Sequence, residues 1–331
     1  MFRINVVYPV VGMLIFLSGC SINQGSMIEM PAEASNQSAL LTNHASTDVW
    51  GFNDQNATFA LQSAIDSGAP TVLVPNVGKP YYVDPIHLVS NQTLILEEGV
   101  VITAREGSFR GRGDCLFLAE NKEEITIIGY GALIEMRKDD YRKRPYEEAE
   151  WRHAISLRGS RNIAIEGLAI RNSGGDGIYI GRGNGKQTYC ENIRIENVIL
   201  ENHYRQGISV ISVRNLLIEN VQIYNTSGTR PRSGIDFEPN RRDEILVNCI
   251  VRSTIIAGNR GPGILFSLQG LVSASHPVSV VVEDCAIYRN LLSILVVGLK
   301  HKPSGEITFR NNERRGLRYI QRSKALKVNF E

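Results

Sequence analysis

Several features that would point to other classes of protein are scarce in this chain of 331 residues. Lysine and arginine number 36 against 34 acidic residues, so the net charge is only +2 and lacks the basic excess typical of nucleic-acid-binding proteins. Beyond the N-terminus there is no apolar run of about 18 residues, the length that suggests a transmembrane helix. Hydrophobic residues still make up 43%. We therefore expect a folded protein that does not bind nucleic acid.

Cysteine is scarce as well, with five residues in the chain. After Cys20, no two cysteines have the two-residue spacing of zinc or thioredoxin-type sites. The spacings are wide and form no disulfide-like pattern, which favours small buried side chains. We therefore predict no functional role for Cys115, Cys190, Cys249 and Cys285.

The first 20 residues have the features of a bacterial export signal. Arg3 supplies a positive charge, and an apolar stretch follows from Val6 to Leu17. Leu17-Ser18-Gly19-Cys20 then resembles the lipobox of bacterial lipoproteins, in which the cysteine is acylated and becomes the mature N-terminus. The alternative is an ordinary secretory signal whose cysteine is incidental.

This resemblance implies a signal peptide over residues 1–19 and a lipid on Cys20. Residues 20–48 are polar and small, so we predict a flexible tether there. Ser21 after the lipidated cysteine resembles lipoproteins of the outer membrane. The expected location is therefore the periplasm or the cell surface, with contact to the membrane through the lipid anchor only.

An internal repeat dominates the rest of the sequence. A short run of alternating aliphatic and polar residues recurs, and each copy is followed by a second strand that contains a Gly-Ile or Ala-Ile step. A period of 20–50 residues with alternating strands is typical of a solenoid, and no 3.6-residue periodicity accompanies it. We predict one all-β domain over residues 49–331, a single-stranded right-handed parallel β-helix with Asn and Gly at its corners. The first strands are 125–129, 163–167, 193–197, 216–220, 280–284 and 307–311, with a degenerate copy near 249–251, and the second strands are 153–157, 176–180, 206–210, 233–237 and 262–266.

The segment before the repeat predicts an N-terminal capping helix. Residues 53–66 have the pattern of a short amphipathic helix, and 71–75 and 81–83 have that of the first strands. Together with Ser-Asn-Gln-Thr-Leu-Ile-Leu-Glu-Glu-Gly at 90–99, this order resembles the pectate-lyase-like superfamily, particularly its polygalacturonase branch. The resemblance covers about residues 49–311. It implies that the helix covers the open end of the β-helix, whose backbone would otherwise be unpaired.

The C-terminal segment allows three interpretations. Residues 327–331 have the pattern of the first strand of a coil that is not completed. A shortened cap over residues 314–324, a chain shorter than its relatives, or a partner that covers this edge would each account for it.

Stacking the second strands predicts a pair of carboxylates on one outer face. If the isoleucine of each Gly-Ile step points inward, Ser156, Tyr179, Ser209 and Asp236 form an outward column. Glu238 follows Asp236 on the same face, about 6.6 Å away along the strand. Such a pair suits acid–base catalysis or a shared Ca²⁺ ligand set, so Ca²⁺ is a possible cofactor and no other is indicated.

The turns that lead into these strands hold further polar residues, so we predict a groove beside the carboxylates. A solenoid surface normally has isolated charges, whereas these turns stack arginine, histidine, tyrosine and carboxylate side chains together. The candidate catalytic residues are Asp176, Asp236, Glu238, His153, Tyr204 and Arg205, and the candidate substrate-binding residues are Arg152, Arg232, Tyr179, His203 and Gln206.

Two chemistries fit this groove. In a hydrolase, one carboxylic acid protonates the glycosidic oxygen while a carboxylate activates water. In a lyase or epimerase, Tyr204, His203 or His153 removes the proton next to a uronate carboxylate that Arg205 or Arg232 neutralises. The arginines favour an anionic polysaccharide in either case. A glycoside hydrolase is the leading expectation, and a glycan-binding lipoprotein without catalysis is an alternative of another class.

The polygalacturonase resemblance transfers to few site residues. The positions that match the family's catalytic coils are 152–153, 175–176 and 205–207, and of the family's carboxylates only Asp176 is kept. The charged stretch 137–150 is either a solvated loop or a wall of the groove. The glycine-rich stretch 181–186 is expected to be an insertion between two strands.

Overall fold

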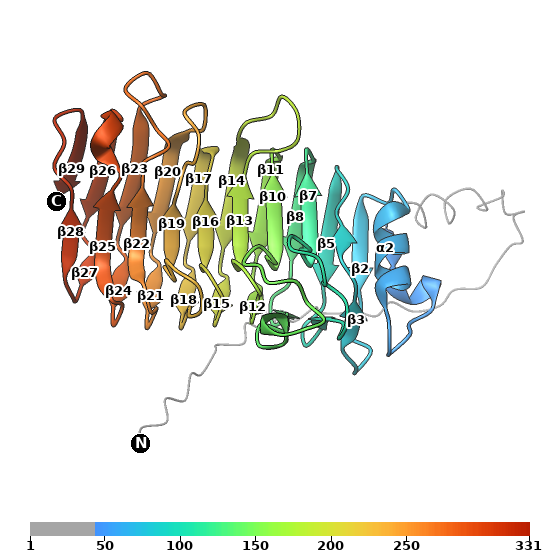
Figure 1. The fold of residues 1–331 in the computed structure, drawn as a ribbon. Helices are drawn as coiled ribbons and strands as arrows, with labels where there is room; N and C mark the ends of the chain where they lie inside the picture. The colour runs from blue at the N-terminus through green and yellow to red at the C-terminus, as the bar shows by residue number, and fades with distance from the viewer. Residues whose placement is uncertain (1–43) are drawn as a thin grey trace, which may run out of the picture.

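The computed structural model describes residues 44–331, and these form a right-handed parallel β-helix (Figure 1). The predicted signal peptide, Cys20 and most of the predicted tether lie outside the described residues. Within the described part, three parallel sheets run along the stack, and each coil contributes one strand to each sheet. The predicted fold class is therefore confirmed.

Sheet 1 contains the strands predicted from the first repeat pattern, including the degenerate copy at β20. Across the described residues it has eleven strands: β1 His44–Ser46, β2 Thr71–Val74, β5 Gln92–Leu96, β8 Glu123–Ile128, β11 Arg161–Glu166, β14 Cys190–Glu196, β17 Val213–Glu219, β20 Leu246–Arg252, β23 Val278–Glu283, β26 Gly305–Arg310 and β29 Leu326–Phe330.

Sheet 2 was not foreseen as a separate sheet, because most of its strands are only three residues long and show too little alternation. The segment 81–83, predicted as a first strand, belongs to this sheet and not to sheet 1. In residues 44–331 it has nine strands: β3 Tyr81–Val83, β6 Val101–Ala104, β9 Leu133–Glu135, β12 Ala169–Arg171, β15 Ile199–Glu201, β18 Gln222–Tyr224, β21 Ile255–Ala257, β24 Ala286–Tyr288 and β27 Glu313–Arg314.

Sheet 3 contains the predicted second strands and supports the candidate site. Its nine strands in the described part of the chain are β4 Ile86–His87, β7 Phe117–Glu120, β10 Ile155–Arg158, β13 Ile178–Gly181, β16 Ile208–Val210, β19 Ile235–Phe237, β22 Pro262–Ser267, β25 Leu292–Val297 and β28 Arg318–Ile320. The first isoleucines of the strands align into one buried ladder, since each coil leaves half of every inward side chain uncovered until the next coil stacks on it.

Helix α2 (Thr58–Asp66) lies at the N-terminal end of the described stack, as Figure 1 shows. Ala60, Leu61, Ala64 and Ile65 are buried, which agrees with the predicted amphipathic helix over residues 53–66. Three short 3₁₀ helices also occur in the described chain, η1 Thr47–Trp50, η2 Asp140–Arg142 and η3 Leu299–His301. The helices found in residues 44–331 are too short or too polar to cross a bilayer.

One predicted boundary and one of the three interpretations of the C-terminal segment need correction. Strand β1 pairs in register with β2, so residues 44–48, which were assigned to the flexible tether, already belong to ordered structure. At the other end, residues 314–324 do not form a cap. They contribute to strands β27 and β28, which continue the same three sheets. The segment 327–331 does form a first strand, as its pattern predicted, because β29 pairs with β26.

The four cysteines in the described chain are free and buried, as predicted. Asparagine also has the predicted role at the corners, since most non-glycine residues with positive φ are asparagines. Along the start of sheet 1 their side chains form a ladder. Asn215 donates to Asn192 (2.7 Å) and accepts from Asn248 (2.9 Å).

This ladder predicts how Asn215 contributes to stability. We expect Asn215→Ala to lower the free energy of unfolding by about 1–3 kcal/mol, because alanine loses both hydrogen bonds and is strained at φ 59°. Asn215→Gly removes the hydrogen bonds without the strain, so its loss should be smaller by about 1 kcal/mol. Urea unfolding followed by circular dichroism measures both, and equal losses would contradict the strain argument.

Candidate active site

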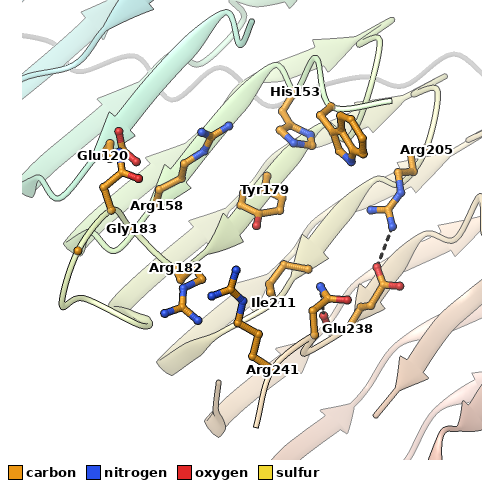
Figure 2. Close-up of a pocket in the computed structure, with 14 residues that line it drawn as sticks. Glu120, His153, Arg158, Tyr179, Arg182, Gly183, Arg205, Ile211, Glu238 and Arg241 are labelled. Carbon is orange, nitrogen blue, oxygen red and sulfur yellow. Dashed lines mark hydrogen bonds and ion pairs between the residues drawn. The ribbon is translucent and has the colours of Figure 1, made fainter. Parts of the chain in front are cut away.

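A pocket of about 630 Å³ lies on the outer face of sheet 3 and the adjacent loops (Figure 2). Four of the predicted site residues line it, namely His153, Tyr179, Arg205 and Glu238. Successive strands of sheet 3 and their flanking turns place basic, acidic and aromatic side chains next to one another around the pocket.

The strand register brings the predicted column together. Ser156 pairs with Tyr179, Tyr179 with Ser209, and Ser209 with Asp236 on neighbouring strands of sheet 3. The prediction that these residues share one column is therefore confirmed. Ser156, Ser209 and Asp236 nevertheless have no exposed surface, so of this column only Tyr179 lines the pocket.

Arg205 connects the acidic residues of the site. Its Nη2 donates to Glu238 at 2.8 Å, its Nη1 lies 3.8 Å from Oδ2 of Asp176, and its Nε lies 3.6 Å from Glu150. Burial lowers the pKa of the Arg205 guanidinium, but the carboxylates of Asp176 and Glu238 raise it by a larger amount. The net shift of the pKa is therefore upward. Arg205 is therefore a permanent cation that holds several carboxylates close together.

His153 and Asp176 form a second, neighbouring pair. Nδ1 of His153 lies 3.1 Å from the backbone nitrogen of Asp176 and 3.2 Å from its Oδ2. The imidazole also stacks on Tyr179, with ring centroids 4.7 Å apart. Burial raises the pKa of Asp176, but His153 and Arg205 lower it by more, so the net shift is downward. Burial raises the pKa of Tyr179 to about 12, which keeps its hydroxyl protonated.

The pKa of Asp236 is shifted in the opposite direction from that of Asp176. Burial, together with the nearby Glu238 carboxylate, raises its pKa well above the ordinary value, and Arg205 offsets this only in part. Gln206 donates to Oδ2 of Asp236 at 2.7 Å. Two carboxyl groups of one site, Asp176 and Asp236, thus have pKa values that are shifted in opposite directions, an arrangement typical of acid–base sites.

Three arginines form a cationic wall on the other side of the pocket from Arg205 (Figure 2). We name Arg158, Arg182 and Arg241 the arginine wall. Nε of Arg158 donates to Ser156 (3.0 Å), and Nη1 of Arg182 lies 3.5 Å from Asp243. In the described chain Arg241 has no carboxylate within ion-pair distance, so its charge is available to a ligand.

The sequence interpretation did not assign the arginine wall to the site. Arg182 belongs to the glycine-rich stretch 181–186, which was expected to be only an insertion, and Arg241 follows the end of strand β19 in a loop. Their contribution depends on how far each loop folds back over sheet 3. Glu244, which is almost fully buried, accepts from the backbone nitrogen of Arg241 (2.9 Å) and lies 3.7 Å from Arg182.

Three of the predicted substrate-binding residues are fully buried and do not reach the pocket. Arg152 is fully buried and donates to the backbone oxygens of Phe109, Arg110 and Glu147. The expectation that it binds substrate directly is corrected, because its side chain holds two loops together. Gln206 is likewise buried and is used by Asp236 and by the backbone nitrogen of Ser233.

His203 needs the same correction. Its side chain is fully buried, and Nδ1 lies 2.8 Å from the hydroxyl of Ser173. Burial and the nearby Lys138 lower the pKa of His203 to about 3, so the ring is neutral at physiological pH. It therefore contacts the turn structure and not a ligand.

Tyr204 and Arg232 lie outside the lining of the main pocket. Tyr204 lines an adjacent depression together with Glu150 and Trp151. Arg232 is half-buried at φ 62°, and its backbone oxygen accepts from Gly261. Neither side chain therefore lines the pocket that contains Arg205 and Glu238.

The charged stretch 137–150 forms a wall of the groove. Tyr141 and Tyr146 anchor it, since both rings are buried and meet edge to face with centroids 5.1 Å apart. Glu150 at its end faces Arg205. Of the two alternatives for this stretch, the structure supports the wall. In residues 44–331 no three His, Cys, Asp or Glu side chains gather as a metal ion would need.

A sequence model described as the right-handed β-helix region matches residues 148–313, about half of the chain. The chain belongs to the right-handed β-helix family. The β-helix is also similar to two Bacillus subtilis (strain 168) proteins, the SPbeta prophage-derived uncharacterized protein YorA (26% identity over 226 residues) and the uncharacterized protein YclG (28% over 161 residues). The matches cover 58% and 44% of this chain but only 38% and 27% of those proteins, so it spans less than half of their length.

Solved structures share the fold of this β-helix protein. The tailspike protein of Escherichia coli bacteriophage HK620, in complex with a hexasaccharide, has a TM-score of 0.62 at 15% identity, over 89% of this chain and 55% of the tailspike chain. A Yersinia enterocolitica family 28 exopolygalacturonase has 0.55 at 14% (87% and 65%), and an iota-carrageenase bound to iota-carrageenan fragments has 0.52 at 16% (77% and 56%). At these identities the likeness establishes the fold alone.

The raised pKa of Asp236 predicts a pH-dependent stability. The folded protein keeps a proton that the unfolded chain releases above about pH 4, so the stability from protonated Asp236 is lost as pH rises through the folded pKa. Asp236→Asn keeps an oxygen for Gln206 without a titrating proton. We expect it to raise the urea midpoint relative to wild type at about pH 8 and to leave it nearly unchanged at about pH 4.

The control for this experiment is Asp66→Asn, which changes an exposed carboxylate at the end of α2. Its effect on the urea midpoint should be the same at both pH values. A destabilisation by Asp236→Asn that is equally large at both pH values would show that Asp236 is not protonated in the folded protein.

Proposed function

We propose that this protein is an extracytoplasmic enzyme that cleaves an anionic polysaccharide by hydrolysis. The observation that supports it best is the pocket on sheet 3, where His153 and Glu238 face the arginine wall. A proton donor and a carboxylate thus lie beside cations that suit an acidic sugar.

The two pocket-lining groups have complementary roles in this proposal. His153 is the proton donor to the glycosidic oxygen in this proposal, and Oδ2 of Asp176, 3.2 Å from its Nδ1, stabilises the positive charge of the donating ring. Glu238, held by Arg205, activates the water that attacks the sugar. Burial and the Glu238 carboxylate raise the pKa of Asp236 beneath the pocket, which favours its neutral form and limits the negative charge around Arg205.

The ion pairs that Arg205 already makes with protein carboxylates favour hydrolysis over elimination. A uronate lyase needs a cation that neutralises the substrate carboxylate next to the base. Arg205 already faces Asp176, Glu238 and Glu150, so little of its charge remains for a substrate. In the described residues, Arg158 and Arg241 of the arginine wall have no carboxylate within ion-pair distance, and they lie away from Arg205 (Figure 2).

A lyase or epimerase remains the second candidate, supported by the position of His153 in the pocket beside Tyr179. In that reaction the neutral imidazole removes the proton next to the uronate carboxylate. The structural neighbours named for polygalacturonan or iota-carrageenan cleavage, and the tailspike with its bound hexasaccharide, support a carbohydrate ligand for either reaction.

The function is tested by incubating the full-length protein with a panel of uronic-acid, sulfated and neutral polysaccharides. Reducing ends and the ultraviolet absorbance of unsaturated uronate are followed together, with and without Ca²⁺. We expect reducing ends without new absorbance on an acidic glycan, and Glu238→Gln should lower kcat by about 100-fold or more. The exposed Glu98→Gln is the matched control, with unchanged turnover.

Three other outcomes contradict this proposal. Absorbance that rises with the reducing ends would identify a lyase, and His153→Gln should then abolish it. Binding without any cleavage would identify a glycan-binding protein. Cleavage by Glu238→Gln at the wild-type rate would show that the site is placed wrongly.

We also propose that the enzyme acts while anchored to the outer membrane through a lipid on Cys20, facing the periplasm or the cell surface. The support is the Leu-Ser-Gly-Cys sequence after an apolar stretch, and two or more acyl chains anchor a protein stably. In a bacterial host fed an alkyne-labelled fatty acid, the wild-type chain should be labelled and sediment with membranes. Cys20→Ala should remove the label, and an unlabelled, soluble wild type would refute the anchor.

A further inference from the structure

A second depression of about 520 Å³ continues the groove beyond the main pocket, and Trp151 lines both. Tyr204, Thr229 and Arg112 lie on its other sides. Trp151 is 42% exposed, which is unusual for so large an apolar side chain. An exposed aromatic ring at the border of two adjoining cavities suits the apolar face of a sugar that extends out of the first cavity.

The two cavities differ in charge. Four arginines and two glutamates line the main pocket, whereas three glutamates and one arginine line the second. The glutamates are Glu147, Glu148 and Glu150, and the guanidinium of Arg112 lies 5.1 Å from the centre of the Trp151 ring. A carboxylate on a bound sugar is therefore attracted in the main pocket and repelled in the second depression.

The second depression is a built feature of the fold. Arg152 donates to the backbone oxygen of Glu147, and the backbone nitrogen of Glu147 donates to Arg110. The Tyr146 hydroxyl accepts from the backbone nitrogen of Gly107 (2.9 Å). These contacts fix the segment that presents the glutamates and Trp151. A third depression further along is lined by Glu147 and Glu148 together with three basic residues. Its mixed charge favours neither an acidic nor an uncharged sugar.

We propose that the groove binds an alternating glycan, with an acidic sugar against the arginine wall and an uncharged or amino sugar against Trp151. This inference rests on the proposed function and names the substrate class. A homopolymer of uronate would place a carboxylate beside Glu147 and Glu148. A chain with an uncharged sugar at that position avoids the repulsion and keeps the contact with the indole.

Calorimetric titration of the slow Glu238→Gln variant of the full-length protein tests this. The probes are a hyaluronan hexasaccharide, in which uronate alternates with an uncharged N-acetylhexosamine, and a polygalacturonate hexasaccharide, in which every sugar is a uronate. We expect the alternating probe to bind at least about fivefold more tightly. Adding Glu147→Gln with Glu148→Gln should tighten only polygalacturonate, by about the same factor. Trp151→Ala should weaken both probes by about tenfold.

The matched control adds Glu98→Gln with Glu306→Gln, which removes two exposed carboxylates from coils outside the groove and should leave both affinities unchanged. Equal affinity for the two probes, binding of neither, or a groove double variant that behaves like the control would overturn the inference. These binding results do not test the proposed function. That function fails if the wild-type protein cleaves none of the polysaccharides in the full panel.

Discussion

Parallel pairing in register between successive coils is the constraint on which the rest of the structure depends. Each strand of sheet 3 meets its neighbours residue for residue, so a side chain in one coil has a fixed partner in the next. The inward isoleucines are covered only because the next coil places another isoleucine at the same depth. The same register places Ser156, Tyr179, Ser209 and Asp236 in one outward column, of which Tyr179 lines the pocket.

Within that frame, Arg205 organises the charges of the candidate site. A buried guanidinium lets Asp176 and Glu238 approach each other and so offsets their mutual repulsion. The balance is incomplete, because Asp236 has no exposed surface and, within residues 44–331, no ion-pair partner at contact distance, and its pKa is raised well above the ordinary value. His153 and Arg205 together lower the pKa of Asp176, whereas burial and Glu238 raise that of Asp236, and such opposite shifts suit acid–base chemistry.

The loops give this common solenoid its individual surface. Segment 137–150, the glycine-rich loop at 181–186 and the loop after β19 each extend over sheet 3, and together they enclose a groove that is cationic at one end and acidic at the other. Buried polar residues such as Arg152 and Glu244 fix these loops through backbone hydrogen bonds. The solenoid thus supplies a rigid base, while the loops set the charge that a ligand meets.

The amino-acid sequence by itself determined the coil repeat, the capping helix, the asparagine corners and the column that contains Asp236, because a two-residue alternation and a fixed coil register place side chains without knowledge of distant contacts. It also brought His153, Asp176, Arg205 and Glu238 together as candidates. Burial and loop position were decided only by the tertiary structure. Whether Arg152, His203 and Gln206 face a ligand or the interior depends on which loops fold over them. Arg182 and Arg241 join the site because the loops after β13 and β19, which are separated by the coil of β16, converge above the sheet, and no local sequence pattern encodes that convergence.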